Sequence, residues 1–249
     1  MELESLLSQF VPISLAEMDA VELTNRIDTK FVFHRSLLPE ILSELTPFYK
    51  LLTIDGHNLH LYETLYFDDE NHNLYLNHHN QRGNRFKLRL RRYGTSASCF
   101  MEVKRKTNTG RTIKSRSKTT GFELQLAQEQ ENFFRTKSGH TDGKWKFATK
   151  INFHRITLVS FDPPERMTFD LDLTFMNHQE SKALNNLIVA EVKQGSKAPS
   201  HFIHAMKQRH IHPFSISKYC LGLSMLNPGL KQNLFKKQQT IIQKIQNRA

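Results

Sequence analysis

The segment Lys87-Leu-Arg-Leu-Arg-Arg-Tyr93 alternates cationic and apolar residues, and this pattern decides how the fold is predicted. Successive side chains of a strand point to opposite faces. As a strand, the segment places Lys87, Arg89 and Arg91 on one face and its leucines on the other. A row of like charges repels itself, so we expect the basic face to meet water or a densely charged anion.

Two following segments repeat this arrangement. Residues 98–106 put Glu102 and Lys104 on one face of a predicted strand, and residues 112–118 put Lys114 and Arg116 on one face of the next. Three solvated outer faces are the plain alternative, but a surface sheet normally mixes charges of both signs. The repeated excess of positive charge therefore favours a shared wall around an anion.

Length, net charge and cysteine count limit the classes of protein and of partner that are possible. The chain has 249 residues, a net charge of +11 and two cysteines. Its length suits one large sheet-based domain, and its charge predicts acidic partners such as polyphosphate, nucleotides, nucleic acid or an anionic membrane surface. Two cysteines cannot form a disulfide framework, which favours a reducing, cytoplasmic compartment. No signal peptide and no transmembrane segment are expected, because no apolar run approaches the ~20 residues that cross a bilayer. A peripheral membrane or membrane-protein partner stays open.

Hydrophobic periodicity and turn signals predict an α+β fold. Predicted strands cover residues 24–34, 49–54, 59–67, 74–80, 87–93, 98–106, 112–118, 150–161, 165–175 and 186–194, and predicted helices cover 2–10, 14–21, 36–45, 121–135, 199–209, 217–226 and 230–246. Many strands of similar length favour an antiparallel β-barrel of about eight strands, or a strongly curved sheet, that forms a tunnel with flanking helices. We expect one domain over 1–249, with an N-terminal helical segment at 1–22, the barrel core at 24–226 and a C-terminal helix at 230–249.

A closed sheet would send one alternate set of these charged residues into its lumen. The lumen would then hold many cations and a few carboxylates. Desolvated cations require anions, a linear phosphate chain matches a row of them, and the carboxylates can hold a divalent metal that bridges phosphate oxygens. Phosphoryl transfer requires positioning, a metal and fixed positive charge, and no covalent nucleophile of the protein.

The order of the charged motifs resembles that of a known family. The motifs are Arg26-x-Asp-x-Lys30-Phe, Tyr66-Phe-Asp68, Lys87-x-Arg-x-Arg91-x-Tyr-Gly94, Glu102-x-Lys104, Lys114-x-Arg116, Arg155, Arg166-x-Thr-x-Asp170, Glu191-Val-Lys193 and Ser217-Lys218-Tyr219. Their series resembles the VTC domain, the catalytic domain of the vacuolar transporter chaperone complex and of its bacterial relatives. That domain belongs to the triphosphate tunnel metalloenzyme (CYTH-like) superfamily.

The resemblance implies an ATP-dependent polyphosphate polymerase that holds the triphosphate in a tunnel-shaped β-barrel with Mg²⁺ or Mn²⁺. By the same resemblance, the phosphate-binding cations are Lys30, Arg89, Arg91, Lys104, Lys114, Arg155, Arg166 and Lys218. Further contacts to the nucleotide are expected from Lys87, Arg116 and Lys193. Metal binding is expected from Glu191, with Asp170 and Asp172 as further carboxylates. The two aspartates could instead neutralise Arg166 and Arg155.

Two alternative functions stay open. A hydrolase of tripolyphosphate or nucleoside triphosphate would use the same tunnel, although hydrolytic tunnel enzymes carry Glu-x-Glu-x-Lys where this chain has Arg26-Ile-Asp-Thr-Lys30. A non-catalytic module would bind polyphosphate. Nucleic acid is not expected, because the basic faces carry almost no aromatic residue for base stacking apart from Tyr93.

Strand alternation alone does not put every expected ligand in the tunnel. Arg155 falls on the same face as Ile151 and Phe153, and Glu191 falls on the same face as Leu187 and Val189. We therefore expect either a bulge in these strands or a polar lumen that extends along only part of them.

Overall fold

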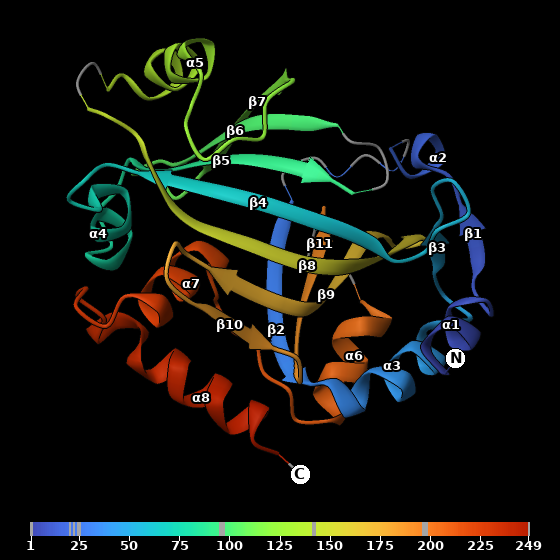
Figure 1. The fold of residues 1–249 in the computed structure, drawn as a ribbon. Helices are drawn as coiled ribbons and strands as arrows, with labels where there is room; N and C mark the ends of the chain where they lie inside the picture. Colours follow the sequence, from blue (N-terminus) through green and yellow to red (C-terminus); the bar gives the residue numbers. More distant parts are fainter. Residues whose placement is uncertain are drawn as a thin grey trace.

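The computed structural model describes residues 2–19, 21, 23, 26–94, 98–140, 143–195 and 199–248. Its centre is one sheet of 11 strands, whose main hydrogen-bonded order is β2-β11-β9-β8-β4-β5-β6-β7. The sheet is strongly curved, so that β2 and β11 run steeply inclined to β4 and β8 in the view of Figure 1. Within the described residues the two end strands, β2 and β7, do not pair, so the predicted tunnel barrel is present but is not strictly closed.

The predicted α+β class is confirmed by the order of elements. The strands are β1 (Val11–Ile13), β2 (Ile27–His34), β3 (Lys50–Leu52), β4 (His60–Asp68), β5 (Arg85–Tyr93), β6 (Cys99–Lys106), β7 (Thr112–Thr119), β8 (Lys146–Phe161), β9 (Pro164–Met176), β10 (Ser181–Leu184) and β11 (Leu187–Gln194). The helices are α1 (Glu2–Leu7), α2 (Leu15–Asp19), η1 (Arg35–Leu37), α3 (Leu38–Leu45), α4 (Asn73–His79), α5 (Gln128–Ser138), α6 (His201–Gln208), α7 (Lys218–Leu226), η2 (Asn233–Phe235) and α8 (Lys236–Gln246). None of these helices combines the length and the apolar composition that a membrane crossing requires.

Most predicted elements lie within a few residues of the observed ones, with some exceptions. Strand β10, which pairs with β9, is absent from the prediction. Helix α5 begins at Gln128, later than predicted, and the C-terminal helix opens with the 3-10 turn η2. The predicted strand start at 24 and residue 20 of the predicted helix at 14–21 lie outside the described residues.

The segment predicted as a strand at 74–80 is instead helix α4, so this prediction is wrong. The carboxylate of Asp68 accepts hydrogen bonds from the backbone N–H groups of Leu74 and Tyr75, each at 2.9 Å. These bonds satisfy donors that a helix start leaves without a partner. Because the acceptor lies several residues before the helix, the local alternation of apolar residues gave no sign of it.

The three basic strands form antiparallel neighbours, as predicted. In their register Arg89 lies opposite Glu102, and Lys104 lies opposite both Lys87 and Lys114. Residues directly opposite each other share a face of the sheet. The basic rows of β5, β6 and β7 therefore form one continuous surface.

Apolar cores cover the convex side of this sheet. Phe31, Phe169 and Met167 pack with residues of α3 and α6 in one cluster, and Leu88 and Val103 pack with Phe134 of α5 in another. The charged rows are thereby left to the concave side.

Helix α7 occupies part of the concave side. Its residues Tyr219, Cys220 and Leu223 pack against Phe175 and Val189 of the sheet. Gly222 lies so close to the sheet that a Cβ atom there would be 2.5 Å from Cδ1 of Phe175. The concave side is thus divided into an apolar part, which α7 fills, and a polar part.

The close approach at Gly222 gives a test of this packing. A glycine-to-alanine change in an exposed helix raises stability by about 0.5–1 kcal/mol, whereas overpacking a core costs about 1–3 kcal/mol. We expect Gly222→Ala to lower the free energy of unfolding measured in urea. Thr240→Ala on the exposed side of α8 is the control and should change it little. A more stable Gly222→Ala protein would contradict the packing.

Candidate functional site

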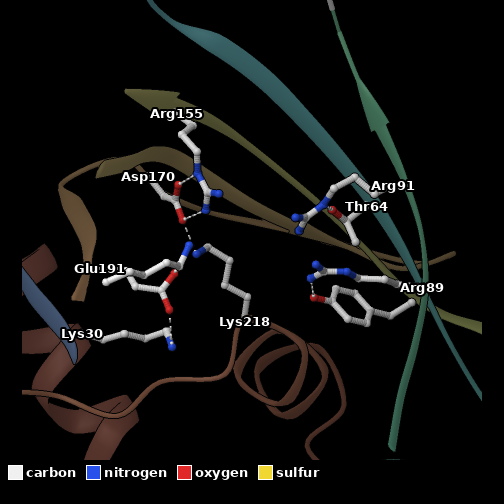
Figure 2. Close-up of polar contacts among 10 residues, drawn as sticks. Lys30, Thr64, Arg89, Arg91, Arg155, Asp170, Glu191 and Lys218 are labelled. Carbon is white, nitrogen blue, oxygen red and sulfur yellow. Dashed lines mark hydrogen bonds and ion pairs between the residues drawn. The ribbon is translucent and has the colours of Figure 1, made fainter. Parts of the chain in front are cut away.

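Side chains from six strands and one helix converge on the polar part of the concave side. Figure 2 shows Lys30, Thr64, Arg89, Arg91, Arg155, Asp170, Glu191 and Lys218 pointing toward one another from β2, β4, β5, β8, β9, β11 and α7. We call the space that these residues enclose, together with Lys87, Glu102, Lys104, Lys114, Arg116 and Lys193, the lumen. Its cations outnumber its three carboxylates, Glu102, Asp170 and Glu191.

Glu102 is the buried counter-ion of the basic strands. Its side chain is 1% exposed, and its Oε2 atom lies 2.6 Å from Nη2 of Arg89. Its Oε1 atom lies 2.5 Å from Nζ of Lys114 and 3.9 Å from Nε of Arg116. Burial alone would raise the pKa of Glu102, but Arg89, Arg91 and Lys114 outweigh burial and hold the pKa far below its usual range. Glu102 is therefore a fixed negative charge that orders three cations.

Asp170 holds two further cations in place. Arg155 donates to both of its carboxylate oxygens, from Nε at 2.6 Å and from Nη2 at 2.8 Å, and Lys218 donates to Oδ2. Burial would raise the pKa of Asp170, but Arg155 and Lys218 lower it to about 2. A single arginine engages both oxygens at once and the side chain is 2% exposed, so the geometry suits a positioning carboxylate better than a metal ligand.

Glu191 is the carboxylate that fits a metal best. Its two oxygens lie 2.9 Å from Nζ of Lys30 and 3.5 Å from Nζ of Lys193. The described residues contain no group of three acidic, histidine or cysteine side chains that could hold a metal ion by themselves. Mg²⁺ commonly binds through one or two carboxylates together with substrate phosphates and water. Glu191 fits such a shared site once an anion draws the lysines away.

Several lumen cations have no acidic partner. Within the described part of the chain, Lys87, Arg91 and Lys104 make no ion pair; Lys87 donates to Oγ of Ser217 at 2.7 Å and Arg91 donates to Oγ1 of Thr64 at 3.3 Å. Desolvation by the surrounding lumen side chains, with Lys87, Lys30 and Arg89 nearby, lowers the pKa of Lys104 to about 8, although the residue is open to solvent on one side. Unpaired cations in a partly desolvated space favour a multivalent anion as ligand.

The start of helix α7 adds to this potential. Ser217 caps the helix, and its hydroxyl accepts a hydrogen bond from the backbone N–H of Cys220. The first residue of the helix, Lys218, directs its amine to Asp170 inside the lumen. Backbone N–H groups at a helix start carry partial positive charge, so the backbone and the Lys218 side chain both favour an anion here.

Arg155 reaches the lumen on the same face of β8 as Ile151 and Phe153, because β8 pairs with β4 without interruption from Thr64–Ile151 to His60–Arg155. The bulge lies instead on the neighbouring strand β9. The register between β8 and β9 shifts between Asn152 and His154, and on the partner strand Asp172 has a φ of +54°. Glu191 needs no bulge either. Leu187 and Val189, on the same face of β11, pack against α7 in the apolar part, so the lumen covers only the last residues of that face.

Two predicted site residues do not join the others. Asp172 forms ion pairs with Arg35 and with His154 and is half-exposed. Arg166 donates to the backbone oxygen of Met18 at 2.7 Å, beside Asp19 of α2. Of the two aspartates that could have neutralised Arg155, it is Asp170 that forms the ion pair.

Sequence reasoning gave no role to Tyr66, which lies in one of the motifs, and it missed Tyr62 and His78. Arg89 donates from Nη1 to the hydroxyl of Tyr66 at 2.9 Å, and Arg155 lies over the ring of Tyr62 at 4.7 Å. Strand alternation on 59–67 could have placed both tyrosines with Thr64. His78 of α4 accepts a hydrogen bond from Nε of Arg85 at 3.3 Å, and burial with Lys87 and Arg85 lowers its pKa to about 2. Sequence reasoning did not find His78, because the segment 74–80 was wrongly predicted as a strand.

A family model of the VTC domain matches residues 25–227 of the chain. The chain belongs to the VTC domain family. Membership supports a role in polyphosphate or triphosphate chemistry. Among curated proteins, none matches this VTC domain significantly in sequence.

Solved structures confirm the tunnel fold. A proposed adenylyl cyclase from Hippeastrum, described as having a dominant triphosphatase activity, shares 16% identity and a TM-score of 0.53 over 80% of this chain and 96% of its own. A proposed adenylate cyclase from Bacillus halodurans shares 13% identity and a TM-score of 0.46, covering 78% of this chain and 96% of its own. At 16% identity, the likeness to the Hippeastrum protein shows the fold alone.

The lowered pKa of Lys104 predicts pH-dependent anion binding. In the free protein Lys104 is charged below about pH 8, and a bound anion raises its pKa. Its contribution to affinity is therefore complete below pH 8 and is lost as the pH rises above it. The Kd for tripolyphosphate should rise by up to about tenfold per pH unit there. Lys104→Arg should flatten this rise because arginine stays charged, whereas Lys137→Arg on exposed α5 should not. Equal slopes for wild type and Lys104→Arg would contradict the assignment.

Proposed function

We propose that this VTC domain is an ATP-dependent polyphosphate polymerase that transfers the terminal phosphate of ATP to a growing polyphosphate chain. The observation that carries the proposal is the convergence of cations from separate strands and α7 around only three carboxylates (Figure 2). Because the cations outnumber the carboxylates, the lumen has enough unpaired positive charge to bind a triphosphate and a polyphosphate chain together. ATP and polyphosphate are the proposed ligands.

The lumen cations would perform the transfer by positioning and charge stabilisation. Arg89, Arg91 and Lys114 would hold the nucleotide phosphates, while Arg155 and Lys218 would contact the transferring phosphoryl group. A terminal oxygen of the acceptor chain forms the new bond to the γ-phosphorus, and the bond from that phosphorus to the bridging oxygen breaks. The electron pair leaves with ADP. Fixed cations stabilise the charge that moves onto the leaving oxygen.

A divalent metal, Mn²⁺ or Mg²⁺, is proposed as cofactor and would be held by Glu191 together with phosphate oxygens. When bound, such an ion would neutralise charge on the phosphates. Lys30 and Lys193, which hold both oxygens of Glu191 in the free lumen, would then turn to the phosphates. This exchange would keep Lys30, Lys193 and Glu191 paired with opposite charges.

The state of the carboxylates supports phosphate rather than water as acceptor. An attacking water must lose a proton to a base, and a carboxylate with a strongly lowered pKa is a poor base. Surrounding cations lower the pKa of Glu102, Asp170 and Glu191 alike. Asp28 of β2 is a further carboxylate near Lys30 in the sequence, and it forms an ion pair with Arg26 at 3.2 Å. A terminal phosphate is already an anion and needs no base.

Incubation of the purified protein with ATP and Mn²⁺, with and without a short polyphosphate primer, tests the proposal. We expect polyphosphate to form, with one ADP released for each phosphate that is added to the chain. Arg89→Ala should lower the rate about 10²- to 10³-fold, the usual effect of removing one charge-stabilising donor. Arg92→Ala is the control, since Arg92 is on the opposite face of β5 and pairs with Glu63. Orthophosphate without polymer would instead favour the hydrolase.

A second experiment addresses Glu191 through binding. Glu191→Gln removes a negative charge beside Lys30 and Lys193, so tripolyphosphate should bind at least as tightly as to wild type when metal is absent. The gain in affinity on adding Mn²⁺ should be lost in this variant. Glu63→Gln provides the control, because Glu63 also pairs with two cations but belongs to the outer face. An undiminished response of Glu191→Gln to Mn²⁺, measured by calorimetry, would exclude Glu191 as the metal ligand.

A further inference from the structure

Aromatic rings line one region of the lumen, where the sequence predicts almost no aromatic residue apart from Tyr93. Tyr62 and Tyr93 face each other across β4 and β5, with ring centroids 4.9 Å apart. Phe100 of β6 lies opposite Arg91, and its ring is 5.9 Å from that of Tyr93. Because these rings share the face of Arg91, they form a continuation of the phosphate-binding surface.

Arg116 of β7 is stacked on this aromatic patch. Its guanidinium carbon lies 3.4 Å from the ring centroid of Phe100, and Nη2 donates to the hydroxyl of Tyr93 at 3.3 Å. The ion pair with Glu102 at 3.9 Å is long. Contact with the ring and the tyrosine hydroxyl therefore fixes the plane of the guanidinium more than the carboxylate does.

The stacked arginine is open to solvent. The Arg116 side chain is 41% exposed, and Tyr93 and Phe100 are both half-buried. A planar guanidinium held against a ring on one side can receive a second planar group on the other. Every nucleobase offers such a π-face, so aromatic rings and arginines form stacking platforms that tolerate different bases.

The spacing to the phosphate-binding cations suits a nucleotide. Arg116 is two residues from Lys114 along β7, which is about 7 Å at ~3.3 Å per residue. Lys114 in turn joins Glu102 and Arg89. A ribose with its first phosphate spans a comparable length, so a base at Arg116 leaves the following phosphates at Lys114, Arg89 and Arg91.

We propose that Phe100, Tyr93 and Arg116 form a nucleobase-stacking platform, which makes the lumen select a nucleoside triphosphate over inorganic tripolyphosphate. The inference rests on the proposed function and adds the orientation of the bound nucleotide in the lumen. The base remains at the β5–β7 end, and the terminal phosphate points toward Arg155 and Lys218. Stacking without base-specific hydrogen bonds predicts that purine nucleotides bind more tightly than pyrimidine nucleotides, with little distinction between ATP and GTP.

Calorimetry with two ligands tests the platform. The ligands are the non-hydrolysable β,γ-imido analogue of ATP and inorganic tripolyphosphate, each with Mg²⁺. Phe100→Leu should weaken analogue binding about 5- to 100-fold, the range expected for one stacked base, and should change tripolyphosphate binding less than about twofold. Arg116→Lys keeps the positive charge but removes the planar guanidinium. It should therefore also weaken binding of the analogue more than binding of tripolyphosphate.

The control is Phe161→Leu, because Phe161 is an exposed ring under a lysine at the far end of β8. This variant should bind both ligands as wild type does. Equal weakening of both ligands by Phe100→Leu and Arg116→Lys, or no weakening of either, would overturn the platform and leave the polymerase proposal intact. Failure of the wild-type protein to bind either ligand would overturn the proposed function itself.

Discussion

Repulsion among the lumen cations is the constraint on which the rest of this structure depends. Three carboxylates relieve it, and each is shared between cations. Glu102 joins Arg89 of β5 to Lys114 of β7, and Asp170 joins Arg155 of β8 to Lys218 of α7. Removing one partner from a buried pair costs about 3–5 kcal/mol. The carboxylates therefore hold separate elements together and still leave positive charge for a ligand.

The same surface has to be apolar in one part and charged in another. Helix α7 makes this possible by filling the concave side next to Val189 and Phe175. Beyond the helix, Glu191 and Lys193 follow on the same face of β11 and meet the lumen. The close approach at Gly222 allows α7 to sit deeply enough that Lys218, at its first turn, reaches Asp170.

The sequence predicted the basic strands and the family because both depend on local order. Period-two alternation shows which residues share a face, and β5, β6 and β7 follow it without interruption. This alternation failed at α4, because the carboxylate that caps the start of the helix belongs to Asp68, which lies outside the segment. It also failed at Asp172, because a bulge changes which side chains reach the lumen.

By itself, then, the sequence determined that rows of cations line one side of a sheet and that the chain resembles the VTC domain. Only the tertiary structure decided which carboxylate meets which cation, that Arg166 binds near α2, and that Phe100 and Arg116 stack beside the basic surface of β5–β7. The physical reason is that a side chain's face follows from the period of its own strand. Its partners follow from the register, curvature and helix packing of the whole sheet.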